Sequence, residues 1–287
     1  MPQALANVNG KITPLVDAMV PALDRGFLFG DAVYEGLQAV SGKVRFIDLH
    51  FDRLARSLNE LRIGPIDLTR LRQRLMETIA AGPFADAFIY IQITRGAGLT
   101  RTHHFPPPDT RPNEFLFVEP FTDPYVQLRQ TGVKAITHLD LRWHRCDIKS
   151  TNLLGNVLAF QAAREQGANE AILIRPDGTV TEGTRTSLFG VVNGTIRTGP
   201  NSPEILPGVT RSVIIRLIHQ LKLPLEERHL RQEELPHINE LFFTGTTSEV
   251  LPITTLNGNP VADGKPGPFT RRLQEAFNQF VKNGTCI

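Results

Sequence analysis

The sequence has few cysteines and no long apolar stretch, and these shortages exclude several classes of protein. Its 287 residues include only two cysteines, Cys146 and Cys286, which form no disulfide framework and lack the spacing of zinc ligands. No apolar run approaches the roughly 18 to 20 residues of a membrane helix, and the first 20 residues lack the basic start and apolar centre of a signal peptide. We therefore expect a cytoplasmic protein with incidental thiols.

An excess of charge of one sign is also missing. The chain has 31 basic and 29 acidic residues, so no strong field selects nucleic acid or another polyanion. It contains neither the phosphate-binding motif G-x-x-x-x-G-K-[ST] nor the hydrolase motif G-x-S-x-G. His103 and His104 are neighbours whose side chains diverge in an extended segment, and no carboxylate motif accompanies them, so we expect no metal site.

Strand and helix patterns recur in mixed order along the chain, which favours the α+β class. In the first part, strand patterns cover residues 31–40, 44–47, 87–94 and 114–118, and helical stripes cover 49–61 and 66–80. In the second part, we expect a strand at 133–137, a helix at 151–166, hairpins turning at 177–178 and 193–194, and helices from 208 and over 269–281. We predict a small domain over 1–118, a linker over 119–128 and a larger domain over 129–287.

Three features could hold a phosphate group, although each is weak by itself. Val209 and Thr210 follow Gly208 at a predicted helix start, where free backbone N–H groups favour an anion. Thr246 and Thr247 lie in a hydroxyl-rich loop between two predicted strands. Arg53 lies in a predicted helix and could bind a phosphate bidentately, but most such arginines are simply solvated.

Two further side chains could take part in catalysis. Lys149 precedes a predicted helix, and a partly desolvated lysine can act as a nucleophile, although an arbitrary lysine is usually solvated. Glu182 could equally be an exposed turn carboxylate. The loop over residues 95–112 exceeds the roughly 12 to 15 residues usual in compact domains, so we expect it to have a function.

Six segments together resemble the fold-type IV pyridoxal-phosphate enzymes. This family contains D-amino acid, branched-chain and R-selective amine transaminases and aminodeoxychorismate lyase. The matching segments occur in the family's order and nearly span the chain: RGFLFGDAVYE at 25–35, HFDRL at 50–54, DIKSTN at 147–152, TEGT at 181–184, GVTR at 208–211 and TTSEV at 246–250. The resemblance implies two α+β domains of the fold-type IV architecture, with pyridoxal 5'-phosphate (PLP) bound at the domain interface.

The resemblance also implies a role for each candidate residue. Lys149 would hold PLP as a Schiff base and then transfer the proton of the substrate Cα, and Glu182 would hydrogen-bond the protonated ring nitrogen. The phosphate would be bound by Arg53, Val209, Thr210, Thr246 and Thr247.

The long loop narrows the choice within the family. Its segment RTHHFP at 101–106 resembles the R-x-H-x-F-P segment of the D-amino acid transaminases. By that resemblance, Arg101 and His103 would bind the substrate α-carboxylate together with Tyr34. In this family the loop comes from the neighbouring subunit, so the resemblance implies a homodimer. Departures at Ala32, residues 35–37 and Gly245 leave the preferred side chain of the substrate open.

We therefore predict a PLP-dependent D-amino acid transaminase that moves the amino group of a D-amino acid such as D-alanine to 2-oxoglutarate, giving D-glutamate and a 2-oxo acid. The alternative is a branched-chain L-amino acid transaminase or an R-selective amine transaminase of the same fold, and a further one is aminodeoxychorismate lyase. A non-catalytic regulatory protein is disfavoured because both Lys149 and Glu182 are present. The sequence does not indicate activity toward primary amines, assembly beyond a dimer or the role of Cys146.

Overall fold

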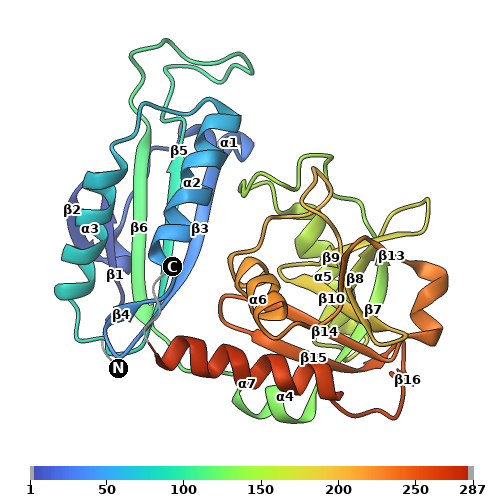
Figure 1. Cartoon of the computed structure of the whole chain (residues 1–287). Helices are drawn as coiled ribbons and strands as arrows, with labels where there is room; N and C mark the ends of the chain where they lie inside the picture. Colours follow the sequence, from blue (N-terminus) through green and yellow to red (C-terminus); the bar gives the residue numbers. More distant parts are fainter. Residues whose placement is uncertain (1–2, 284–287) are drawn as a thin grey trace. The chain divides into compact units, whose positions relative to one another are not determined.

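The computed structural model describes residues 3–283, which form two compact units (Figure 1). The first unit contains the described chain up to Thr122 and also the short segment Ile148–Asn152. The second unit contains Asp123–Asp147 and the described chain from Leu153 onward. The segment around Lys149 therefore returns to the first unit, which no local sequence pattern had indicated.

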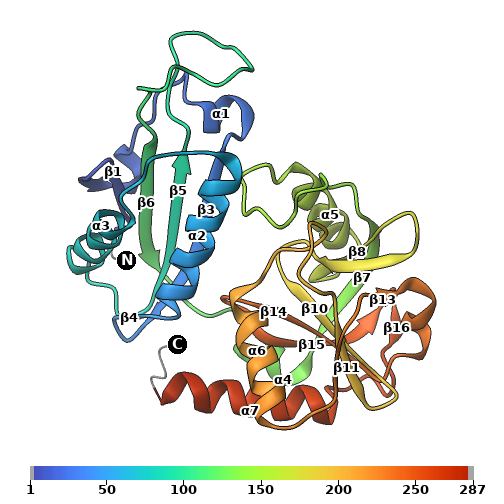
Figure 2. The same cartoon turned by 45° about the horizontal axis from the view of Figure 1, so that its top comes forward.

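The first unit is a six-stranded antiparallel sheet with two long helices packed on it (Figures 1 and 2). Its strands, in the order β2-β1-β6-β5-β3-β4, are β1 (Leu5–Val8), β2 (Lys11–Pro14), β3 (Ala32–Val40), β4 (Lys43–Val44), β5 (Ala87–Thr94) and β6 (Asn113–Pro120). Its helices are the single turn η1 (Leu15–Asp17), α1 (Arg25–Phe29), α2 (Ile47–Leu61) and α3 (Leu68–Ala80). Ile89, Ile91 and Ile93 alternate along β5 and are fully buried beneath the helices, as the period of a strand requires.

Most elements predicted for this unit are confirmed, with two corrections. The predicted strand over 44–47 is wrong beyond Val44, because Phe46 adopts a left-handed conformation and α2 begins at Ile47. Residues 25–29 form the short helix α1, which Asp24 caps by accepting a hydrogen bond from the backbone N–H of Gly26. The expected pairing of residues 87–94 with 114–118 is present as β5 and β6, and the loop joining them lies at the same end of the sheet as α1 (Figure 1).

The second unit is built on a mixed ten-stranded sheet. Its strands are β7 (Val133–Leu139), β8 (Glu170–Ile174), β9 (Thr179–Gly183), β10 (Ser187–Val192), β11 (Thr195–Thr198), β12 (Leu225–Glu227), β13 (Leu230–Arg231), β14 (Glu240–Gly245), β15 (Glu249–Leu256) and β16 (Asn259–Pro260). Its helices are α4 (Val126–Thr131), α5 (Leu154–Glu165), α6 (Val209–Gln220), η2 (Gln232–His237) and α7 (Pro268–Lys282). Both predicted hairpins are present, as β8 with β9 and β10 with β11, and the α+β class is confirmed.

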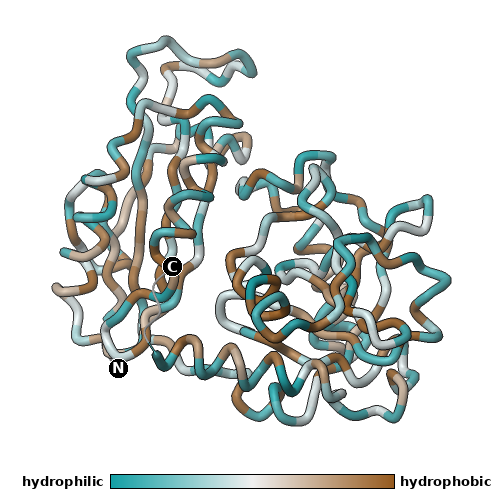
Figure 3. The backbone as a smooth tube through the Cα atoms, viewed as in Figure 1, coloured by the Kyte–Doolittle hydropathy of each residue, from teal (hydrophilic) through white to brown (hydrophobic). Residues whose placement is uncertain are grey.

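Two helices of this unit illustrate what local patterns do and do not predict. The helix expected over 151–166 begins only at Leu154, because the backbone N–H of Thr151 donates a hydrogen bond to Ala32 in the first unit's sheet. Helix α7 buries Thr270, Leu273 and Phe277 at helical spacing, and both hydrophobic and hydrophilic segments occur along it (Figure 3). None of the helices in residues 3–283 is long and apolar enough to cross a membrane.

Candidate active site

Lys149 lies on an extended segment that pairs with the start of β3. The backbone N–H of Tyr34 donates to the carbonyl oxygen of Lys149 at 2.9 Å, and Val33 and Ser150 form an antiparallel bridge. Ile148 and Ser150 are buried on either side of the half-buried Lys149, so the alternation of an extended chain directs the Lys149 side chain away from the core. Its Nζ lies 4.2 Å from the centroid of the Tyr34 ring, so the structure brings these two predicted site residues together.

Behind Tyr34, a buried cluster of charged side chains holds Arg53. The Nε and Nη2 groups of Arg53 donate to the two carboxylate oxygens of Glu35 at 2.8 and 2.7 Å, and His50 Nδ1 lies 2.7 Å from the same carboxylate. Burial disfavours the charged form of Glu35, but Arg53 and His50 outweigh it and lower the Glu35 pKa to about 2. Burial lowers the pKa of His50, so its ring is neutral and donates through Nδ1–H to the ionised carboxylate. Sequence analysis assigned no role to Glu35 or His50.

The loop that carries Arg101 and His103 is anchored by Arg25. The guanidinium of Arg25 donates to the backbone carbonyls of Thr102 at 2.7 Å, of His104 at 3.1 Å and of His103 at 3.3 Å. Both Arg25 and Arg95 also bind Asp31, whose pKa they lower against the opposing effect of burial. These anchors were not predicted from the sequence, because Arg25 and the loop, like Arg95 and Asp31, are more than 60 residues apart along the chain.

Arg101 and His103 are themselves exposed and lie beside Phe29. The guanidinium carbon of Arg101 is 4.9 Å from the Phe29 ring centroid, and the His103 ring is 5.4 Å from it. Within residues 3–283, no hydrogen bond, ion pair or ring contact joins Arg101 or His103 to Lys149. The structure therefore brings these two residues together with each other but not with Lys149 of the same chain.

In the second unit, Glu182 on β9 is fully buried against Arg142. Arg142 Nη1 donates to Glu182 Oε1 at 2.5 Å, while the Nε and Nη2 groups of Arg142 bind Asp140 at 2.9 and 2.8 Å. The backbone N–H of Leu206 donates to the Glu182 carboxylate at 3.2 Å. Burial raises the Glu182 pKa, as does the negative charge of Asp140, and Arg142 only partly offsets them. Sequence analysis predicted a role for Glu182 but none for Arg142 or Asp140.

Val209 and Thr210 form the first turn of α6, directly after the segment that binds Glu182. Gly208 provides no side-chain cap, so the first backbone N–H groups of α6 keep their capacity to bind an anion. A Cβ atom on Gly208 would lie 2.6 Å from Ser187 Oγ, so glycine is required for this close approach of a hydroxyl group. The α6 start thus combines backbone donors with neighbouring hydroxyl groups.

Thr246 and Thr247 lie in the turn between β14 and β15, where several hydroxyl groups are buried. Within residues 3–283, the buried oxygens Thr244 Oγ1, Ser248 Oγ and Thr186 Oγ1 have no hydrogen-bond partner. Buried hydroxyl groups without partners are rare, and they are typical of sites that receive a ligand or water. A Cβ on Gly245 would approach Ser248 Oγ to 2.7 Å, so a side chain at this position would require that hydroxyl group to move.

Cys146 is a buried thiol in the second unit. Its Sγ lies 3.1 Å from the carbonyl oxygen of Trp143, and burial raises the pKa of the thiol to about 11. The thiolate needed for reactivity is therefore disfavoured near neutral pH. Cys286 lies outside the described residues. The structure contains no group of three or more His, Cys, Asp or Glu side chains within residues 3–283 that could hold a metal ion.

Comparison with known protein families identifies the chain. The family model for amino-transferase class IV matches residues 32–256, which include Lys149 and Glu182. The chain belongs to the class IV aminotransferases. The predictions of a PLP-dependent aminotransferase and of the fold-type IV architecture are thereby confirmed at the level of the family.

Individual relatives agree with this assignment. The chain is 38% identical to a D-alanine aminotransferase of Staphylococcus haemolyticus, over 96% of this chain and 97% of the relative, and 37% identical to one of Bacillus licheniformis, over 97% of each. Among solved structures, it is similar to the branched-chain amino acid aminotransferase of Escherichia coli, with a TM-score of 0.88 and 25% identity over 96% of this chain and 94% of that one. It is also similar to the branched-chain aminotransferase of the archaeon Thermoproteus uzoniensis, solved with norvaline, with a TM-score of 0.85 and 26% identity over 98% and 95% of the two chains.

The donor set fits PLP. A phosphate needs several hydrogen-bond donors and positive charge, which the uncapped start of α6, the unpartnered hydroxyl groups and Arg53 can provide. A protonated ring nitrogen needs a buried acid beside it, and the buried Glu182 could fill that role. An aldehyde needs a primary amine at the edge of the core, and the half-buried Lys149 could provide it.

Proposed function

We propose that this aminotransferase is a D-amino acid transaminase that moves the amino group of a D-alanine-like substrate to 2-oxoglutarate, giving D-glutamate and a 2-oxo acid. The observation that carries this proposal is the identity of 37% to 39% with D-alanine aminotransferases over nearly the whole length of the chain. The solved branched-chain enzymes share the fold at lower identity, 25% for the Escherichia coli protein. The RTHHFP segment at 101–106 supports the same choice.

Each half of the cofactor would be held by different residues of the chain. Val209, Thr210, Thr246 and Thr247 would donate backbone and hydroxyl hydrogen bonds to the phosphate, and Arg53 would add its charge. Glu182 would keep a proton on the ring nitrogen. When bound, PLP supplies an electron sink for the negative charge that develops on the substrate Cα. Because Arg142 and the Leu206 amide fix the Glu182 carboxylate, little reorganisation is needed as that charge appears.

Lys149 would hold the cofactor through its amine and, once the substrate amine has replaced it there, move the proton of the substrate Cα. The extended backbone between Ile148 and Ser150 restricts the positions that this amine can reach. Tyr34, whose ring lies beside Nζ, would limit the approach of the amine to one face of the substrate.

Tyr34, Arg101 and His103 would bind the substrate α-carboxylate. Arg101 can bind a carboxylate bidentately, and His103 can add a donor. Since both side chains lie beside Phe29 rather than Lys149 in their own chain, we propose that they complete the site of a second copy in a cytoplasmic homodimer.

A half-reaction assay tests the proposed function directly. D-alanine, L-leucine and (R)-1-phenylethylamine are each added alone to the purified holoenzyme, and the absorbance change that accompanies amination of the cofactor is followed. We expect rapid conversion with D-alanine only. Conversion by L-leucine or the amine alone would instead identify the branched-chain or amine transaminase, and release of pyruvate from aminodeoxychorismate without an amino acceptor would identify the lyase.

The substitution Arg101→Ala tests the carboxylate site. We expect the KM for D-alanine to rise about tenfold or more, because a charged hydrogen bond to the substrate is lost, while cofactor affinity stays the same. Arg111→Ala removes another exposed arginine of the same loop and serves as the control. An unchanged KM in Arg101→Ala would show that the loop does not bind the carboxylate.

A further inference from the structure

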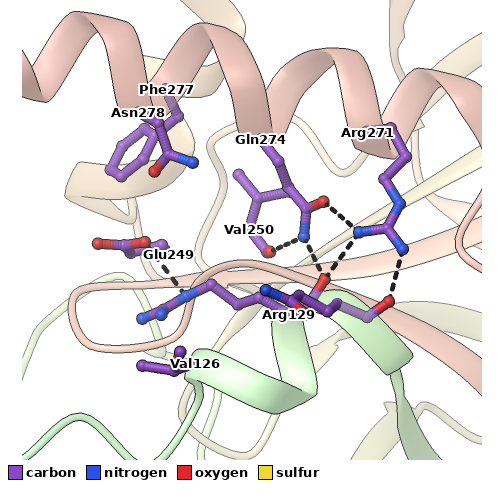
Figure 4. A pocket seen from close by; sticks show the side chains of 9 residues that line it. Val126, Arg129, Glu249, Val250, Arg271, Gln274, Phe277 and Asn278 are labelled. Atoms are coloured by element: carbon purple, nitrogen blue, oxygen red, sulfur yellow. Dashed lines mark hydrogen bonds and ion pairs between the residues drawn. The ribbon is translucent and has the colours of Figure 1, made fainter.

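One arginine side chain binds the backbone carbonyl oxygens of the turn that contains Thr246 and Thr247. Arg129 on α4 donates from Nη2 to the carbonyl oxygen of Thr247 at 2.9 Å and from Nε to that of Ser248 at 3.1 Å. The same Nε lies 3.1 Å from the carboxylate of Glu249 (Figure 4). A single guanidinium therefore contacts three consecutive residues of the turn.

This turn needs such support because of its backbone conformation. Glu249 adopts φ 56°, in the left-handed region that residues with a Cβ avoid. A strained conformation persists only where the surrounding structure determines it, and the ion pair with Arg129 provides that constraint. The fork of a guanidinium suits this task better than an ammonium group, because its donors have fixed directions.

Arg129 is itself fixed by its surroundings. Its Nη1 binds Asp123 at 2.7 Å, and its backbone carbonyl accepts hydrogen bonds from Arg271 at 3.2 Å and Gln274 at 2.8 Å on α7. Gln274 also binds the carbonyl of Val250 at 3.0 Å. Arg129, Arg271, Gln274 and Val250 line a pocket of about 320 Å³ beside the turn (Figure 4). Only 15% of the Arg129 side chain is exposed, so solvent screens these interactions weakly.

We propose that Arg129 is a positioning residue for the cofactor phosphate: it sets the conformation of the turn over 246–249 before the phosphate binds. This inference rests on the proposed function, in which Thr246 and Thr247 bind that phosphate. It assigns to Arg129 no contact with the cofactor. Pre-organising the turn lowers the entropy lost on binding, so loss of Arg129 weakens binding of the phosphate group in particular.

The first test measures the turn without any ligand. Hydrogen exchange of the peptide containing residues 246–249 is compared in cofactor-free full-length wild type, Arg129→Met and Arg197→Met. Arg197 is the matched control, because it lies in the same unit, is 17% exposed and binds two carboxylates, those of Glu226 and Glu234. We expect the rate of hydrogen exchange in the turn to rise about tenfold in Arg129→Met only, because this variant loses the side chain that binds the carbonyl oxygens of the turn. Unchanged exchange would overturn the proposal.

The second test separates the phosphate from the rest of the cofactor. Dissociation constants are measured for pyridoxamine 5'-phosphate and for pyridoxamine, which lacks the phosphate. We expect Arg129→Met to raise the dissociation constant of pyridoxamine 5'-phosphate about tenfold and to leave that of pyridoxamine unchanged. Arg129→Lys should have an intermediate effect on pyridoxamine 5'-phosphate. Equal loss for both ligands, or no loss, would overturn the proposal.

The controls keep these outcomes distinct. If Arg129→Met does not fold, as judged by its thermal transition, Arg129→Lys takes its place in both tests, because it keeps the charge and loses the fork. If the wild type binds neither ligand, the proposed function fails, whereas hydrogen exchange still decides whether Arg129 holds the turn.

Discussion

Two buried carboxylates, Glu35 in the first unit and Glu182 in the second, each bind an arginine but have opposite pKa shifts. Glu35 receives two hydrogen bonds from Arg53 and a third from neutral His50, and its pKa falls to about 2 although burial opposes this. Glu182 receives one hydrogen bond from Arg142, whose other donors serve Asp140, and burial raises its pKa. The presence of an arginine therefore does not decide the charge of a buried acid.

The difference indicates different tasks for the two acids. Glu35 is a fixed anion that orients Arg53, so its main effect should be on folding. Glu182 lies in a network with one arginine for two acids, so it retains affinity for a further positive group such as a protonated ring nitrogen. The following variants test whether this division between stability and catalysis holds.

The largest effect on stability is expected from Glu35→Gln. This change leaves the buried Arg53 charge facing a neutral amide, and breaking a buried ion pair in this way costs about 3 to 5 kcal/mol of unfolding free energy. Urea denaturation of the full chain measures it. Asp48→Asn is the control, because Asp48 pairs with Arg72 on the surface, with both side chains about half exposed, and should cost less than about 0.5 kcal/mol. A loss as small as the control's would mean that the Glu35 cluster does not stabilise the fold.

Glu182→Gln should instead mainly affect turnover. Losing a preorganised charge at the ring nitrogen should lower kcat by about 10² to 10³, or roughly 3 to 4 kcal/mol, while the unfolding free energy changes little because Arg142 keeps Asp140. Steady-state kinetics with D-alanine measure this. Glu170→Gln is the control, since Glu170 is another buried acid with a raised pKa in the same unit but has no proposed contact with the cofactor. If both variants lose the same activity, Glu182 has no special role.

The opposite shifts also predict opposite pH dependences of stability. The lowered pKa of Glu35 gives stability that is present above its unfolded pKa of about 4.5 and is lost as the pH falls toward 2, by about 2 kcal/mol at pH 3. The raised pKa of Glu182 gives stability that is present at low pH and is lost as the pH rises through that pKa. The stability of Glu35→Gln should therefore approach that of wild type as the pH falls. The stability of Glu182→Gln relative to wild type should increase as the pH rises. Urea denaturation from pH 3 to pH 8 measures both differences. If the unfolding free energies of both variants follow that of wild type across this range, the predicted difference between the two acids is wrong.

Local patterns predicted the elements well where hydrophobic periodicity was strong. The strands β5 and β6, both hairpins and α7 lie within a few residues of their expected bounds, because burial of one face determines the period. The short helices α1 and α4 were missed, since one or two turns show too little periodicity. The late start of α5 at Leu154 depends on pairing of Thr151 with Ala32, a contact between distant parts of the chain.

The candidate site shows the same limit. Lys149, Glu182 and Arg53 were predicted as site residues because each lies in a segment that resembles a family, and that signal is local. Arg142 and Arg129 were not identified, because their roles come from partners 40 and 118 residues away. Such partners can be found only once the sheet brings them together.

The smallest effect is expected from Ser57→Ala, which tests how the first unit holds the lysine segment. Ser57 is fully buried on α2, and its Oγ accepts a hydrogen bond from the backbone N–H of Lys149 at 3.3 Å. This bond is long, so its loss should cost only about 1 kcal/mol of unfolding free energy. The turnover should fall only slightly, because the backbone hydrogen bond between Tyr34 and Lys149 remains. Ser57→Thr keeps the hydroxyl and serves as the control. A fall in kcat comparable with that of Glu182→Gln, without comparable loss of stability, would mean that the position of Lys149 depends on this one hydrogen bond, and that α2 contributes to catalysis as well as to stability.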